Sequence, residues 1–83
     1  MNNREKLFDV FKQVFGIHEV TKEMTQNDIP EWNSLQMINL IMALEEVFEI
    51  QIMPEEAADM LSVELVMDIL AEKGVAFNAE GAV

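Results

Sequence analysis

The segment from Ser34 to Phe48 constrains the fold of this chain more than any other. Its apolar positions are Leu35, Met37, Ile38, Leu40, Ile41, Met42, Leu44, Val47 and Phe48. They leave only a narrow polar stripe, which runs through Gln36, Asn39, Ala43 and Glu46. This pattern predicts a helix that is apolar nearly all round. Such a helix lies at the centre of a fold or offers its outer side to a partner.

The start of this helix carries a capping signal. Asn33 precedes Ser34, and Gln36 follows three residues after Asn33. This is the spacing of a capping box, in which the Asn33 side chain caps the helix and the Gln36 side chain reaches back. Ser34 then falls in the first helical turn, with its hydroxyl near solvent.

An earlier helix is predicted over residues 3–15, followed by a long loop over residues 16–33. The helix has one apolar stripe, a capping residue at Asn2 or Asn3, and Gly16 at its end. A long loop persists in a small domain only if side chains anchor it. The expected anchors are Ile17, Val20, Met24, Ile29 and Trp32.

Two shorter helices are predicted after Phe48. Pro54 disfavours helical geometry in the residue before it and can open a short helix over about residues 55–61. Ser62 is placed to cap a last helix, which ends at Lys73 and Gly74. The chain is therefore predicted to be all-α, a four-helix bundle with three longer helices and a short third one. At 83 residues it makes one domain over residues 1–74, with a flexible tail over residues 75–83.

The charge of the chain excludes several kinds of partner. Five basic and sixteen acidic residues give a net charge of -11. Nucleic acid and anionic membrane surfaces are disfavoured because both require clustered Lys and Arg. Residues 34–83 hold one basic residue, Lys73, and ten acidic ones, so most of the negative charge lies behind Ser34. A basic patch on another protein is the expected complement.

No residue pattern indicates catalysis or a metal site in the chain itself. There is no cysteine, and His18 is the sole histidine, without a second group to form an acid–base pair. The acidic pairs at 45–46 and 55–56 lack the alternating ligands and central glycine of a Ca2+ loop. We expect no enzyme activity and no metal. With no signal peptide and no bilayer-spanning run, we expect a cytoplasmic protein, monomeric and without membrane insertion.

Residues 28–73 resemble the acyl carrier protein family. The family's hallmark is Asp-Ser-Leu at the start of the second helix, and here the run is Asn33-Ser34-Leu35. The stretch from Leu40 to Phe48 is very similar to the family's second helix, and Glu55-Glu56-Ala57 continues the similarity without gaps. The resemblance implies that a phosphopantetheinyl transferase attaches 4'-phosphopantetheine from coenzyme A to the Ser34 hydroxyl. The arm would then carry acyl groups as thioesters in fatty acid, specialised lipid or polyketide biosynthesis.

The resemblance also implies two sets of contact residues. Acyltransferases, ligases or synthases with basic docking patches would meet a recognition surface made of Asn33, Leu35, Met42, Glu45, Glu46 and Glu49. The acyl chain would retreat between the second and third helices, into a space lined by Leu40, Leu44, Ile52, Met60 and Leu61.

The chain departs from the family pattern at several positions. Asn33 replaces the Asp before the serine, and Gln36, Asn39 and Val47 occupy positions that are usually acidic. With Trp32 ahead of the motif, these changes indicate a specialised stand-alone carrier. A carrier of amino acids or peptides, or an unprimed helical interaction module, remains an alternative reading.

Overall fold

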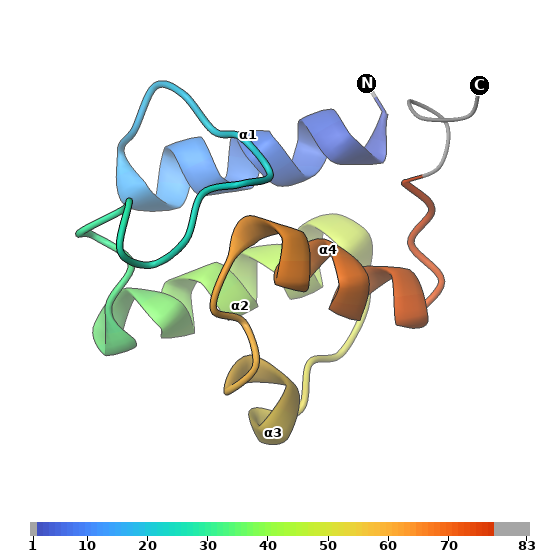
Figure 1. The fold of residues 1–83 in the computed structure, drawn as a ribbon. Helices are drawn as coiled ribbons and strands as arrows, with labels where there is room; N and C mark the ends of the chain where they lie inside the picture. Colours follow the sequence, from blue (N-terminus) through green and yellow to red (C-terminus); the bar gives the residue numbers. More distant parts are fainter. Residues whose placement is uncertain (1, 78–83) are drawn as a thin grey trace.

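The computed structural model describes residues 2–77, which form four helices (Figure 1). These are α1 (Asn3–Phe15), α2 (Ser34–Phe48), α3 (Pro54–Ala57) and α4 (Val63–Glu72). The described residues contain no β-strand, and a single isolated bridge joins Thr25 to Ser62. The predicted all-α, four-helix architecture is confirmed. None of the helices in this part of the chain has the length and apolar character needed to cross a membrane.

α1 forms where its caps and apolar stripe predict. The Asn2 side chain accepts a hydrogen bond from the Glu5 backbone N–H, and the Glu5 carboxylate accepts one from the Asn2 backbone N–H, so both halves of a capping box are present. Gly16 ends the helix in the left-handed region, at φ 67°, which favours glycine. α1 lies along α2, and these two helices make the most extensive interhelical contact of the fold (Figure 1).

The loop between α1 and α2 is anchored at both the core and the start of α4. Val20, Ile29 and Trp32 are buried. The backbone N–H of Val63 donates to the carbonyl of Met24 at 3.0 Å, and the N–H of Gln26 donates to the carbonyl of Leu61 at 3.2 Å. These bonds fix the loop beside the segment that joins α3 to α4.

α3 is shorter than the predicted helix over residues 55–61 and ends at Ala57. After that point the backbone turns more tightly: the N–H of Asp59 donates to Glu56, and the N–H of Met60 donates to Ala57. The carbonyls of Met60 and Leu61 instead accept bonds from Gln26 in the first loop. The expected length is wrong because this long-range contact holds Met60 and Leu61 outside the helix.

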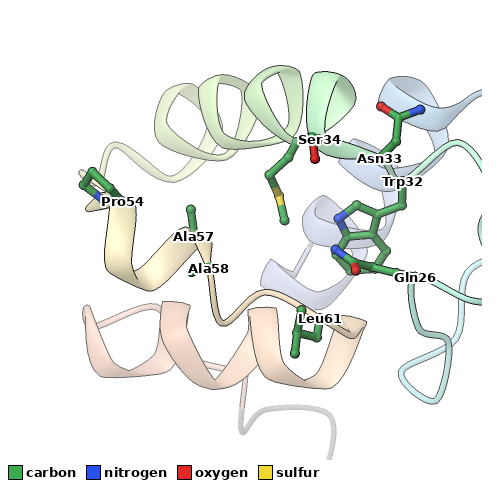
Figure 2. Close-up of a pocket in the computed structure, with 9 residues that line it drawn as sticks. Gln26, Trp32, Asn33, Ser34, Pro54, Ala57, Ala58 and Leu61 are labelled. Atoms are coloured by element: carbon green, nitrogen blue, oxygen red, sulfur yellow. The ribbon is translucent and has the colours of Figure 1, made fainter.

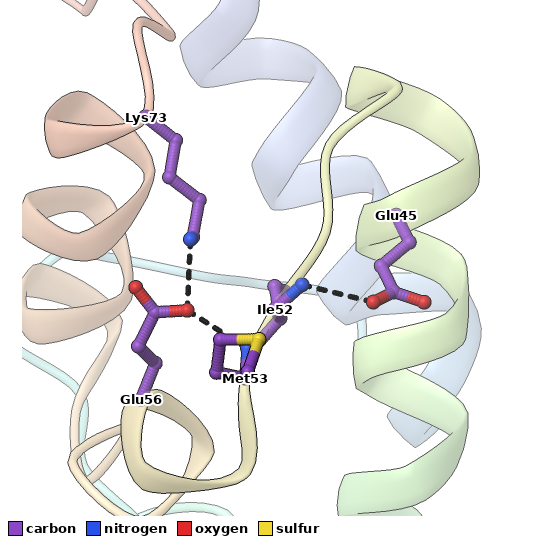
Figure 3. A network of polar contacts seen from close by, with 5 residues as sticks. All are labelled: Glu45, Ile52, Met53, Glu56 and Lys73. Atoms are coloured by element: carbon purple, nitrogen blue, oxygen red, sulfur yellow. Dashed lines mark hydrogen bonds and ion pairs between the residues drawn. The ribbon is translucent and has the colours of Figure 1, made fainter.

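Carboxylates fix the two ends of the α2–α3 connection (Figure 3). The Glu45 side chain accepts from the backbone N–H of Ile52 at 2.9 Å. Glu56 accepts from the N–H of Met53 at 2.8 Å and pairs with the Lys73 ammonium at 2.8 Å. α3 is thereby tied to the end of α4.

α4 begins at the predicted cap and buries one face. The Ser62 hydroxyl accepts from the backbone N–H of Leu65 at 3.1 Å, and Val63, Val66 and Leu70 are fully buried. Beyond the helix, Val75 is also buried, and the Phe77 ring lies 6.5 Å from that of Phe48. Residues 78–83 of the predicted tail lie outside the described residues.

Candidate functional site

The start of α2 is capped by Asn33 rather than by the serine that follows it. The Asn33 backbone is extended, and its side-chain oxygen accepts from the N–H of Gln36 at 2.9 Å. The prediction that the Gln36 side chain reaches back to Asn33 is wrong, because the backbone N–H of Asn33 donates to the carbonyl of Glu31 instead. The Gln36 amide donates to the carbonyl of Val14 at 3.5 Å, and its oxygen accepts from Asn39 at 2.7 Å. Contacts with α1 and the next turn of α2 hold this side chain away from the helix end.

Ser34 is the first residue of α2 and is exposed. Within residues 2–77, no hydrogen bond engages its hydroxyl. The positive end of a helix dipole lies at this position, and the first turn of α2 contains no acidic residue to neutralise it. A phosphodiester on the Ser34 oxygen would therefore meet a favourable field and no repelling carboxylate in that turn.

A pocket of about 490 Å³ opens beside Ser34 (Figure 2). It lies between the first loop, the start of α2, α3 and the segment leading to α4. Its lining consists of Gln26, Trp32, Asn33, Ser34, Met37, Pro54, Ala57, Ala58 and Leu61. The site therefore joins a free hydroxyl to an adjoining hollow with no charged side chain in its wall.

Among the described residues, the Trp32 indole is the one buried polar group of this wall that lacks a hydrogen bond. The residue is only 3% exposed, and its Nε1 atom has no hydrogen-bond partner among the described residues. Leaving such a donor unpaired costs about 1–3 kcal/mol. The sequence shows Trp32 directly ahead of the motif, but only the fold reveals that its nitrogen is buried and unpaired.

The residues predicted to recognise partners lie mainly on the outer side of α2. Leu35 is 74% exposed and Met42 is 61% exposed, and Asn33, Glu46 and Glu49 are exposed as well. Glu45 is half-buried, and its carboxylate is engaged by Ile52.

Ile38 joins this surface although it was not predicted to. It is 58% exposed and lies between Leu35 and Met42 at helical spacing. The i, i+3, i+7 pattern of these three apolar residues was the sequence signal that could have identified it.

Four of the five residues predicted to line an acyl space lie in the closed core. Leu40, Leu44 and Met60 are fully buried, and Ile52 is nearly so. Leu61 is 52% exposed and borders the Ser34 pocket instead. The sequence analysis did not assign Gln26, Met37, Pro54, Ala57 or Ala58 to the site, because their convergence depends on the loop contacts.

The charged residues that follow Ser34 in the sequence are almost all acidic. Lys73, the sole basic residue after Ser34, is paired with Glu56. The hydrogen bond from Lys73 lowers the pKa of the Glu56 carboxyl below its ordinary value, and the Met53 N–H acts in the same direction. Within residues 2–77, no group of three or more His, Asp or Glu side chains is placed to hold a metal ion.

Comparison with known proteins identifies the family. No model of a protein family matches the chain. It is 35% identical over 71 residues to the acyl carrier protein of Buchnera aphidicola subsp. Baizongia pistaciae, a match that covers 83% of this chain and 91% of the relative. It is 32% identical over 73 residues to the acyl carrier protein of Syntrophobacter fumaroxidans, covering 86% and 90%. The chain belongs to the acyl carrier protein family.

A solved structure agrees with this assignment. The holo acyl carrier protein from Geobacter metallireducens is 32% identical and superposes with a TM-score of 0.76, covering 88% of this chain and 86% of that one. Acyl carrier proteins are carriers rather than enzymes, and they bear a covalent 4'-phosphopantetheine group. The expected cofactor is thus confirmed.

Proposed function

We propose that Ser34 is the attachment site of 4'-phosphopantetheine and that the protein carries thioester-linked acyl intermediates. The observation that carries this proposal is the exposed, unbonded hydroxyl of Ser34 at the start of α2. The chain has one other serine, Ser62, whose hydroxyl is engaged as a cap. Of the two serines, Ser34 is the accessible nucleophile.

Priming requires a partner enzyme, a phosphopantetheinyl transferase. The Ser34 oxygen forms a bond to the phosphorus next to pantetheine in coenzyme A, and the P–O bond of the pyrophosphate breaks. Adenosine 3',5'-bisphosphate leaves, and the serine proton passes to the transferase. The attached arm supplies a thiol, which holds cargo as a thioester. This chain contains no cysteine, so that thiol would be the only one on it.

Partner enzymes would dock on the outer side of α2. Leu35, Ile38 and Met42 offer apolar contact, and Glu46 and Glu49 offer negative charge beside it. Basic patches on acyltransferases, ligases or synthases would complement this surface, in a small interface suited to transient transfer. The proposed pathway is fatty acid biosynthesis or a specialised lipid or polyketide route, in the cytoplasm.

Intact mass spectrometry tests the attachment site. The protein is incubated with coenzyme A and a broad-specificity phosphopantetheinyl transferase. We expect a gain of one phosphopantetheine, complete loss of the gain in Ser34→Ala, and an undiminished gain in the matched control Ser62→Ala.

Two outcomes would contradict the proposal. A gain that survives Ser34→Ala would place the modification elsewhere. No gain with several transferases would favour an unprimed interaction module. If priming succeeds, loading assays with fatty acyl, polyketide-type and aminoacyl donors would separate an acyl carrier from an aminoacyl or peptidyl one.

A further inference from the structure

Trp32 presents a polar group that the fold leaves unused at the edge of the Ser34 pocket. Its ring packs edge-on against Phe11, with centroids 5.1 Å apart, and lies 5.6 Å from Phe15. This packing fixes the orientation of the indole. Figure 2 shows its nitrogen-bearing edge turned toward the space bordered by Ser34 and Leu61. A buried donor at the wall of a pocket would gain a hydrogen bond from a ligand that carries an acceptor.

The rest of the wall limits what that ligand can be. None of the lining side chains is charged, so a carboxylate or phosphate inside the pocket would find no cation. Ala57 and Leu61 contribute apolar surface, and Gln26 contributes a carboxamide whose nitrogen donates to the Met60 carbonyl at 3.3 Å. An alkyl chain would fit the apolar wall but would leave the indole N–H unpaired. A neutral chain that combines amides with methylene groups satisfies both.

We propose that the pantetheine arm on Ser34 folds back into this pocket, where one of its amide carbonyls accepts a hydrogen bond from Nε1 of Trp32. This inference rests on the proposed attachment at Ser34. The arm starts from a residue that itself lines the pocket, and it consists of two amides separated by short aliphatic segments. Trp32 acts as a positioning residue.

The sole tryptophan makes the inference directly testable by NMR, because the chain has one indole N–H signal. Nitrogen-15-labelled protein is compared before and after priming, with a free thiol and no acyl cargo. We expect the indole signal to move downfield and its exchange with water to slow by about 3- to 10-fold, the ratio set by one ordinary hydrogen bond. Ser34→Ala carried through the same reaction should keep the unprimed indole signal.

The outcomes separate this inference from the proposed function. If mass spectrometry shows full priming and the indole signal keeps its position and exchange rate, the docked arm is disproved while the attachment stands. If no priming occurs at Ser34, both proposals fail together.

A variant provides a second, independent measurement. Trp32→Phe keeps an aromatic ring beside Phe11 and Phe15 but removes the N–H. Circular dichroism checks that the helices are retained. We expect nuclear Overhauser contacts between the geminal methyls of the arm and Leu61 to weaken by about 3- to 10-fold. Contacts at full intensity in Trp32→Phe would overturn the role of Nε1, and the wild-type comparison remains decisive if the variant does not fold.

Discussion

The two serines of this chain lie at the starts of two helices, but in the described residues only the Ser62 hydroxyl forms a hydrogen bond. Ser62 is the cap of α4, so its hydroxyl is occupied by the Leu65 N–H. At α2 the cap is Asn33, and Ser34 is moved one residue into the helix with its hydroxyl free. The equivalent first helical residue of α4 is Val63, which is fully buried. The Ser34 hydroxyl is therefore left without a hydrogen bond in the described residues because another residue caps α2 and the first turn of that helix faces solvent.

Moving a serine into the first turn of α4 tests the requirement for exposure, and it has the largest expected effect on stability. Val63→Ser places a hydroxyl at a fully buried position. We expect a loss of about 2–4 kcal/mol in the free energy of unfolding, from lost apolar volume and a buried polar group. Urea denaturation measures the loss, and Val63→Ala isolates the volume contribution. A second phosphopantetheine on Val63→Ser would show that burial does not protect this position.

Alanine at the two serines should affect stability and priming in opposite ways. Ser62→Ala removes a helix cap and should cost about 1 kcal/mol. Ser34→Ala removes a hydroxyl with no partner in the described residues, so its cost should be within about 0.5 kcal/mol. Thermal or urea unfolding of the two unprimed variants checks the order. Equal losses would mean that Ser34 contributes to the cap after all.

A substitution at Asn33, the residue that caps α2, further tests how the two helix starts differ. Asn33→Asp preserves the cap, and the added charge favours the helix start, so stability should change by less than about 1 kcal/mol. Any gain in unfolding free energy from Asn33→Asp should be smaller in primed than in unprimed protein, because the carboxylate and the phosphodiester are both negative and then lie at the same helix end. We also expect faster priming, since the carboxylate restores the family pattern before the serine. An unchanged rate in a continuous priming assay would show that the carboxylate is immaterial.

How far the sequence predicted this arrangement depends on how local each signal is. The bounds of α1 and α2 were predictable because caps, apolar stripes and end signals lie within the helices themselves. The length of α3 was not, since the carbonyls of Met60 and Leu61 are held by Gln26 from a distant loop. The same long-range contact forms one wall of the pocket. The free hydroxyl of Ser34 could be inferred from its neighbours, whereas the unpaired Trp32 nitrogen could not.

Docking by charge predicts a further contrast, between two adjacent glutamates. Glu46 is exposed, whereas Glu45 is partly buried and holds the Ile52 N–H. Glu46→Lys should therefore slow acyl transfer severalfold relative to the wild type, and this difference in rate should shrink at high salt. The free energy of unfolding should change by no more than about 0.5 kcal/mol. Glu45→Lys would be less informative, because it would also remove the hydrogen bond to the Ile52 N–H, and slower transfer could then come from lost structure. Transfer rates across a salt series check this, and an unaltered rate in Glu46→Lys would remove that residue from the docking surface.

The smallest expected effect concerns the far end of α4, where an ion pair joins the Lys73 side chain to Glu56 of α3. The hydrogen bond from Lys73, supported by the Met53 N–H, makes the folded pKa of Glu56 lower than its ordinary value of 4.5. A lowered folded pKa contributes stability above the unfolded value, and that contribution is lost as pH falls through the folded one. Glu56→Gln should thus lower the unfolding free energy at pH 7, with the deficit disappearing as pH falls below about 4.5. Glu55→Gln is the matched control, because Glu55 is exposed and forms no ion pair in residues 2–77. A deficit that is constant from pH 7 to acid would mean that Glu56 acts through neutral packing, because only an ionised carboxylate can gain from Lys73.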